Sequence, residues 1–254
     1  MKPSSAPCPL AAAARGFSLV EMAVVLVVFA LLLGGLLMLT TTQMSTQRIQ
    51  ETQKLMEQAR QALVGFAAVH GRLPCPAQPN LASGAPNAGV ERVPLPGGCT
   101  GGQVGVLPWA TLGLPETDAW GRRLTYRVAA LYSRTVIPRP PSQYGCATPP
   151  ASAPAQSAFA LCSPGDNEVR VSAAGVALVT DAPAVLISHG ANGAGAMLPS
   201  GLQMPASADA DEIENHDNDA IAVAGTPRAT YDDLVQWLPA PLLMQSMLSA
   251  GRLP

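Results

Sequence analysis

Aromatic side chains are scarce in this chain, where only 4% of the 254 residues are Phe, Trp or Tyr. Charged residues are also few, at 13%, and the formal net charge is -2. Surfaces that bind nucleic acids combine clustered lysine and arginine with interleaved aromatics, and the sequence contains no such cluster. We therefore expect no nucleic-acid partner.

The sequence also lacks the common motifs of metal binding and catalysis. It has no C-x-x-C, G-x-S-x-G or G-x-x-x-x-G-K-[ST], and its three histidines have no zinc-motif spacing relative to the cysteines. The neighbours Ser188 and His189, like His216 and Asp217, do not make a triad by adjacency, because a triad is defined by geometry. We expect no enzyme and no required cofactor.

Proline and glycine are plentiful instead, with 25 and 23 residues, and 48% of the chain is hydrophobic. That apolar content is ample for a folded core, while so many turn-forming residues predict long irregular connections.

One long apolar run stands near the start. From Phe17 to Leu39, 23 residues carry Glu21 as their sole charge, and the next charge is Arg48. About 20 apolar residues suffice for a helix to cross a bilayer. A cleaved secretory signal has a shorter apolar stretch followed by a small-x-small site, and neither feature is found here. We predict a membrane-spanning helix at residues 17–39.

The junction before this run has a specific pattern. Residues 1–16 carry Lys2 and Arg15 and no acid, and the stretch "RGFSLVE" leads into the apolar segment. This stretch resembles the leader junction of type IV pilins and type II secretion pseudopilins. The resemblance implies that a prepilin peptidase removes the leader after Gly16 and methylates the new amino terminus at Phe17. It also implies an inner-membrane anchor with a cytoplasmic leader and a periplasmic C-terminal domain.

Glu21 is the unusual residue of the run. A charged side chain at the centre of a membrane helix costs about 2.5–3.5 kcal/mol or more, less near the interface, so it is normally paired. The resemblance implies that Glu21 pairs with the Phe17 amine of a neighbouring subunit and sets the filament register. Two alternatives remain: the carboxylate reaches the headgroups, or it complements the helix dipole in the first turn.

The helical pattern continues beyond the run. Residues 40–70 contain no proline, and Leu55, Ala59, Ala62 and Phe66 recur at helical spacing, which predicts an amphipathic continuation. Gly71 and Pro74 predict the end of the helix. A continuous helix from Phe17 to Val69 would be about 80 Å long.

The remaining residues, 71–254, are predicted to form a globular domain. Runs rich in β-branched and aromatic residues predict strands at Gln103–Leu107, Leu124–Ala129, Glu168–Ser172, Ala184–Ser188 and near Tyr231–Leu238. A long helix followed by strands gives an α+β class, with an antiparallel sheet packed on the helix and long Pro/Gly-rich loops. The resemblance implies the pilin fold.

Four cysteines remain once the leader with Cys8 is removed. In an oxidising compartment an even set predicts disulfides among Cys75, Cys99, Cys146 and Cys162. Four cysteines allow three pairings. Pairing between sequence neighbours would close the loops at 75–99 and 138–162, and the sequence leaves the choice open.

Two distal segments extend the resemblance toward the major pseudopilins. They are "DAWGRRLTYRV" at Asp118–Val128 and "LISHGANGAG" at Leu186–Gly195. In those proteins this turn and a later acidic loop hold a calcium ion. Here the later loop, Asp209–Ile221, carries six acids within eleven residues. A solvated acidic loop is the alternative.

If calcium binds, the resemblance implies carbonyl ligands from Ile187 and Ser188, the Asn192 side chain, and the carboxylates of Asp217 and Asp219. Asn192 stands where the family often has Asp, which removes one charge from the set.

These features together predict a prepilin-like subunit of a type II secretion pseudopilus or a type IV pilus, polymerised through its N-terminal helix. Its expected partners are the prepilin peptidase and methyltransferase, other pilin or pseudopilin subunits, and an inner-membrane assembly platform. The alternatives are a minor pilin with a priming or adhesive role, and a solitary membrane-anchored periplasmic binding protein.

Overall fold

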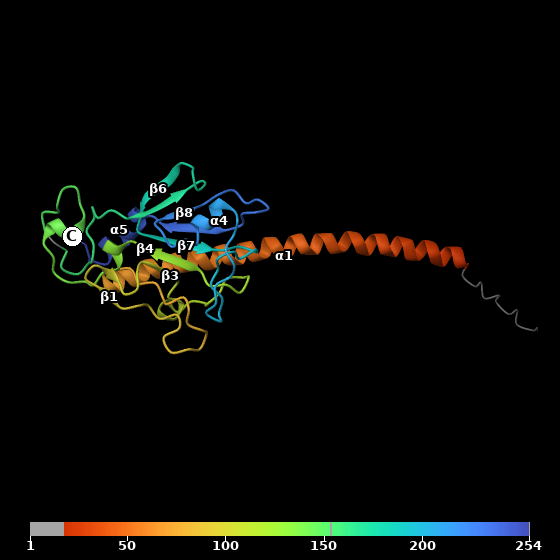
Figure 1. Ribbon diagram of the computed structural model, residues 1–254, viewed down its shortest axis with the longest axis horizontal. Helices are drawn as coiled ribbons and strands as arrows, with labels where there is room; N and C mark the ends of the chain where they lie inside the picture. Colours follow the sequence, from red (N-terminus) through yellow and green to blue (C-terminus); the bar gives the residue numbers. More distant parts are fainter. Residues whose placement is uncertain (1–17, 153, 254) are drawn as a thin grey trace, which may run out of the picture. The chain divides into compact units, whose positions relative to one another are not determined.

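The computed structural model describes residues 18–152 and 154–253, and for residues 32–42 it describes the backbone alone. The chain divides into two compact units, Met1–Gln47 and Arg48–Pro254. One continuous helix, α1, covers Leu19–His70, as the sequence predicts, and is labelled in Figure 1. The unit boundary therefore falls inside this helix, within the predicted segment 40–70.

The first unit consists, in its described part, of the N-terminal stretch of α1. Among the residues that were described, no helix combines the length and the apolar character needed to cross a bilayer. The predicted span, 17–39, includes Phe17 and the side chains of 32–39, which lie outside the described residues.

The second unit is built on the C-terminal stretch of α1. Leu55, Ala59, Leu63 and Ala67 recur every four residues and are buried in the main core, with Met56 beside them. The buried stripe thus follows the i, i+4 row of the helix surface rather than passing through Ala62 and Phe66. Helix α1 ends at His70, and Gly71 follows with a φ of 72°, a left-handed value that suits glycine.

A four-stranded antiparallel sheet packs against this part of α1 (Figure 1). Its strand order is β3-β4-β7-β9, and its members are β3 (Val104–Val106), β4 (Thr125–Val128), β7 (Ala184–Ser188) and β9 (Leu234–Leu238). Tyr126, Val128 and Leu186 point into the core with the helix side chains. All four strands lie within or beside the segments that the sequence predicts.

A second, three-stranded sheet was not expected as a separate sheet. It has the order β6-β5-β8, from β5 (Asn167–Arg170), β6 (Ala177–Ala182) and β8 (Ile221–Val223). The predicted strand near Glu168–Ser172 therefore leaves the main sheet, and β5 pairs with β8 in parallel. A two-stranded ribbon, β1 (Pro94–Leu95) with β2 (Gly98–Cys99), completes the strands of the described chain.

Short helices connect these strands. They are α2 (Trp109–Leu112), α3 (Ala130–Ser133), the 3-10 helix η1 (Pro141–Tyr144) and α4 (Ala210–Glu214). A longer helix, α5 (Ala240–Ser249), buries Leu243, Met244 and Met247 in the main core. The α+β class is confirmed.

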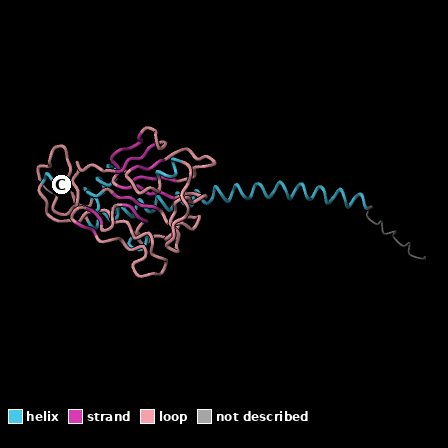
Figure 2. Tube along the Cα trace, viewed as in Figure 1, coloured by secondary structure: helices cyan, strands magenta, loops and turns pink. Residues whose placement is uncertain are grey.

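Loops occupy much of the second unit, as Figure 2 shows in pink. Disulfides join Cys75 to Cys99 and Cys146 to Cys162, so each links neighbours in sequence. The first closes a loop against the core, because both of its cysteines are buried. The second ties the proline-rich segment near the surface, where Cys162 is exposed.

Candidate functional site

The first candidate region is the start of α1. Glu21 accepts a hydrogen bond from the Ser18 amide at 3.0 Å, and the Val20 amide donates to Ser18 Oγ at 3.3 Å. Both contacts satisfy amides that have no partner in the first helical turn. In the single chain Ser18 and Glu21 therefore cap the start of α1 reciprocally. Gly16 and Phe17 lie outside the described residues.

Large apolar side chains are exposed all along this stretch. Leu19 is 90% exposed and Leu31 is 74% exposed. The others of this kind are Val20, Met22, Val24, Val25, Leu26, Val27, Val28 and Phe29. A contiguous apolar surface of this extent marks a site for contact with protein or lipid.

The second candidate region lies where two distant segments meet. Ser188, at the end of β7, donates from Oγ to Asp118 Oδ2 at 2.6 Å, and both residues are buried. The other oxygen of Asp118 accepts from the amides of Trp120 and Arg122 at 2.9 and 3.0 Å. The carboxylate thus fixes its own turn and ties it to β7. These are the two segments that carry the distal resemblance, and the structure brings them together.

The turn after β7 is held from both sides. The Arg122 guanidinium donates to the carbonyls of Gly190 and Ala191. On the other side, Asp232 Oδ2 accepts from the amides of Ala191 and Asn192 at 2.9 and 3.0 Å. These contacts fix the backbone of the turn through its carbonyls on one side and its amides on the other.

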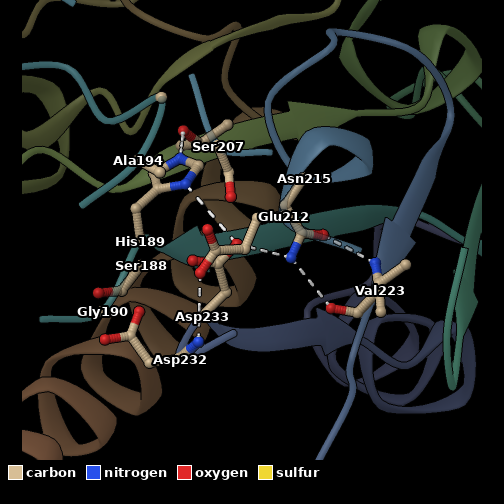
Figure 3. A network of polar contacts seen from close by, with 12 residues as sticks. Ser188, His189, Gly190, Ala194, Ser207, Glu212, Asn215, Val223, Asp232 and Asp233 are labelled. Atoms are coloured by element: carbon tan, nitrogen blue, oxygen red, sulfur yellow. Dashed lines mark hydrogen bonds and ion pairs between the residues drawn. The ribbon is translucent and has the colours of Figure 1, made fainter. Parts of the chain in front are cut away.

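A buried histidine lies beside this turn. His189 Nε2 is 2.8 Å from Thr125 Oγ1. Its Nδ1 is 3.8 Å from Asp233 Oδ2, a contact drawn in Figure 3. Burial lowers the pKa of His189 to about 3, with the charges of His216 and Arg122 acting in the same direction. Burial raises the pKa of Asp233 to about 8, and nearby Glu212 and Asp232 add to the rise. At neutral pH the contact therefore joins a neutral imidazole to a protonated acid rather than two ions.

Three carboxylates gather next to this histidine. Glu212, Asp232 and Asp233 each place an oxygen within 4.8 Å of the others. Glu212 Oε1 accepts from Asn192 Nδ2 at 2.5 Å. Asp233 Oδ2 accepts from Asn215 Nδ2 at 2.8 Å, as Figure 3 shows. Within the described part of the chain, the second oxygens of Asp232 and Asp233 are buried and have no hydrogen-bond partner. The site therefore gathers carboxylate oxygens that need a partner, which a bound cation or added protons would supply.

The calcium ligands predicted from the sequence divide between two places. Asn192 contacts Glu212 and Asp232, whereas Asp217 and Asp219 gather with Glu214 in a separate, more exposed group. Ile187 and Ser188 belong to β7 in the main sheet. The structure therefore brings Asn192 to a carboxylate set that the sequence did not select.

Asp232 and Asp233 were missed because nothing in "TYDDLVQWL" distinguishes them from a polar lead into a strand. The available signal was the pair of adjacent acids at the start of β9, whose neighbour in the sheet is β7.

Comparison with known proteins identifies one feature. Residues 12–37 match the model of the prokaryotic N-terminal methylation motif. This match supports a type IV pilin-like protein, and the α+β architecture with its N-terminal helix is consistent with a pilin fold. No curated protein and no solved structure matches the chain.

Proposed function

Because residues 12–37 carry the methylation motif of prepilin-like proteins, we propose that this chain is a subunit of a helical filament, assembled through its N-terminal helix. Cleavage after Gly16 would free the amine of Phe17, and a methyltransferase would then methylate it. The single observation that best supports assembly is the exposed apolar stretch of α1 that follows the motif, because it needs a covering of lipid or neighbouring helices. The action would be mechanical rather than catalytic.

The role of Glu21 changes on assembly in this proposal. In the single chain its carboxylate contacts the Ser18 amide. In the filament it would pair instead with the Phe17 amine of the next subunit, since a carboxylate removed from water is costly unless an opposite charge lies beside it. The exchange from a local to an intermolecular partner would set the axial register.

Processing can be tested by mass spectrometry of the full chain made with and without a prepilin peptidase. We expect the co-expressed chain to begin at Phe17 and to carry one added methyl group. The variant Gly16→Leu should keep residues 1–16 because a bulky side chain blocks the cleavage site. Identical masses with and without the peptidase would contradict processing.

Assembly can be tested by photo-cross-linking in cells from a probe placed at Val24. Wild type should give ladders of linked subunits, and Glu21→Gln should lose most of them because the side chain keeps its size but loses its charge. The matched control is Glu168→Gln, which removes an equal charge in the second unit. Absence of ladders in wild type would favour the solitary anchored protein over a filament subunit, and equal ladders in all three would contradict the role of Glu21 in assembly.

Between the two filament types we favour the type II secretion pseudopilus over the type IV pilus. The support is the buried contact between Asp118 and Ser188, which joins the two segments that resemble the major pseudopilins. The long proline-rich loops differ from the compact form of the major pseudopilins, so they favour a minor subunit over the major one. Deleting the gene should abolish secretion of a folded substrate, and loss of motility or adhesion alone would favour the pilus.

We also propose that a calcium ion binds beside the turn after β7, held by Glu212, Asp232 and Asp233. The fit rests on the unpartnered buried oxygens of Asp232 and Asp233. Calcium prefers carboxylate oxygens, and its binding would displace the proton that Asp233 carries at neutral pH. The ion would lock the turn rather than take part in a reaction.

This site can be tested by the thermal midpoint of the full chain in detergent, with calcium or with chelator. Calcium should raise the midpoint of wild type and of Asp217→Asn, and Asp232→Asn should abolish the rise. If only Asp217→Asn abolished the rise in the midpoint, the ion would bind at the ligands predicted from the sequence instead. No rise in wild type would contradict any calcium site.

A further inference from the structure

The main sheet ends on one side at β9, and the backbone groups along this edge point outward. In an antiparallel sheet, successive residues of a strand direct their amides and carbonyls to opposite sides. Because the Ala129 amide donates to the Pro183 carbonyl at 2.8 Å, the odd-numbered residues of β7 face β4 and its even-numbered residues face β9. Their partners in β9 are its even-numbered residues, so Val235 and Trp237 direct their backbone groups away from the sheet.

These outward groups have no partner within the protein. Across residues 18–152 and 154–253, no hydrogen bond reaches the amide or the carbonyl of Val235 or Trp237. Both residues are half-buried rather than covered. A row of unpaired amides and carbonyls on a sheet edge is a template for another strand.

Other edges of the two sheets are protected against such pairing. At β3, the amides and carbonyls of Ala77 and Val106 bond to each other at 2.8 and 3.3 Å. Val104, two residues earlier, also faces outward, and its carbonyl accepts from Arg92 at 2.6 Å. The Asn215 side chain bonds to the backbone at the end of β8, and β6 pairs with β5 through two register shifts. Covering and irregular pairing both keep a foreign strand from adding. The β9 edge has neither protection.

A groove of about 410 Å³ lies beside the β9 edge. It is lined by Gln53 and Met56 of α1, by Ala224, Gly225 and Pro227 after β8, and by β9 itself. All of these elements belong to the second unit. A strand added to β9 would therefore have α1 on one face and the segment after β8 on the other.

The chain around this groove is strongly acidic. The segment 209–237, which contains β8 and most of β9, carries eight acidic residues against one arginine, Arg228, a formal charge of -7 with histidine neutral. It stays strongly negative even when Asp233 holds its proton. A field of this sign attracts a basic partner and repels an acidic one.

We propose that β9 binds an extended segment of a basic partner protein, which pairs with Val235 and Trp237 as a fifth strand of the main sheet. In strand addition, main-chain hydrogen bonds supply the affinity and contacts of alternate side chains supply the selectivity. One row of the partner's side chains would pack in the groove against Met56, and lysines or arginines of the other row would face the acidic segment. This interaction goes beyond the filament role and does not depend on it.

The experiment measures binding of the synthetic peptide acetyl-Lys-Val-Lys-Val-Lys-Val-amide to the full chain in neutral detergent, by isothermal titration calorimetry with a chelator present. We expect saturable binding of one peptide per chain, which weakens as salt is added. The same peptide with glutamate in place of lysine should not bind. Binding of both peptides alike would contradict the basic partner.

Methylated peptides test whether the backbone pairs along one edge. One analogue carries N-methyl groups on the amides of its lysines, and the other carries them on the amides of its valines. The lysines and the valines of an extended peptide direct their amides to opposite edges. One analogue should therefore bind like the parent peptide, and the other should not bind. Equal behaviour of the two analogues would overturn strand addition.

A proline in β9 tests the place of binding. Val235→Pro removes an outward amide and no hydrogen bond of the sheet, so the variant should fold and bind the peptide about tenfold more weakly or worse. The matched control is Val104→Pro, which removes an outward amide at the protected β3 edge and should bind like wild type. Both variants must melt cooperatively. Absence of saturable binding to wild type, or equal binding by the two variants, would overturn the site at β9.

Discussion

At the scale of single residues, Glu57 connects α1 to β9. Its carboxylate accepts from Arg60 Nε at 2.9 Å, from Gln61 Nε2 at 3.0 Å and from Gln236 Nε2 at 3.0 Å. The bond from Arg60, followed by those from the two glutamines, lowers the pKa of Glu57 to about 2. A carboxyl whose pKa is depressed by folding stabilises the fold above its unfolded pKa. That stabilisation is lost as pH falls toward the folded value.

We therefore predict that Glu57→Gln lowers the free energy of unfolding by a constant amount above about pH 4.5, the ordinary value for this group. Below that pH the difference from wild type should shrink and vanish near pH 2. Denaturant unfolding at several pH values measures it. Gln236→Ala, which removes only the contact from β9, is the control, and a pH-independent difference for Glu57→Gln would contradict the prediction.

Two glycines near the end of α1 should respond in opposite ways to alanine. Gly65 is inside the helix, and a Cβ there would meet no atom within 4 Å. Gly71 has a φ of 72°, and a Cβ there would lie 2.0 Å from the carbonyl oxygen of Gln156. Gly65→Ala should stabilise the fold by about 0.5–1 kcal/mol. Gly71→Ala should destabilise it by more than about 1 kcal/mol. Equal thermal shifts would contradict this contrast.

At the scale of elements, the two disulfides should differ in their effects. Each closes a loop, with sequence separations of 24 and 16, so loop entropy predicts about 3 kcal/mol from either. Cys75 and Cys99 also belong to the main core, whereas Cys162 is exposed. Replacing Cys75 and Cys99 by serine should therefore lower the melting temperature more than replacing Cys146 and Cys162. Mild reductant should open the exposed bond first, and mass spectrometry after alkylation can show the order.

The local sequence pattern predicted the positions of the strands better than it predicted which strands pair. The runs "LTYRVA" and "AVLIS" gave β4 and β7, because alternation and branched side chains are visible in a short window. The parallel pairing of β5 with β8 joins strands about 50 residues apart, and only tertiary packing decides it. The same holds for the candidate site, because the contact of Asn192 with Glu212 depends on where α4 packs.

At the scale of the whole molecule, the predicted boundary at residue 71 and the compact unit at Arg48–Pro254 make different predictions about truncation. Leu55, Met56, Ala59, Leu63 and Ala67 fill the main core from α1. Each fully buried Leu or Met contributes about 1.5–3 kcal/mol. A typical domain is stable by only about 5–15 kcal/mol. The free energy lost on removing this stretch of helix should therefore exceed the whole stability of the domain.

We predict that a fragment of residues 48–254 folds without detergent, with a cooperative thermal transition and both disulfides formed. A fragment of residues 71–254 should lack a cooperative transition and give no near-ultraviolet circular dichroism, because the sheet loses the helix that covers it. A third fragment, 48–254 with Leu63→Ala, should still fold. Its free energy of unfolding should be lower by about 2–5 kcal/mol, and it should melt at a lower temperature. A cooperative transition in 71–254 would mean that the sheet and α5 form a core without α1.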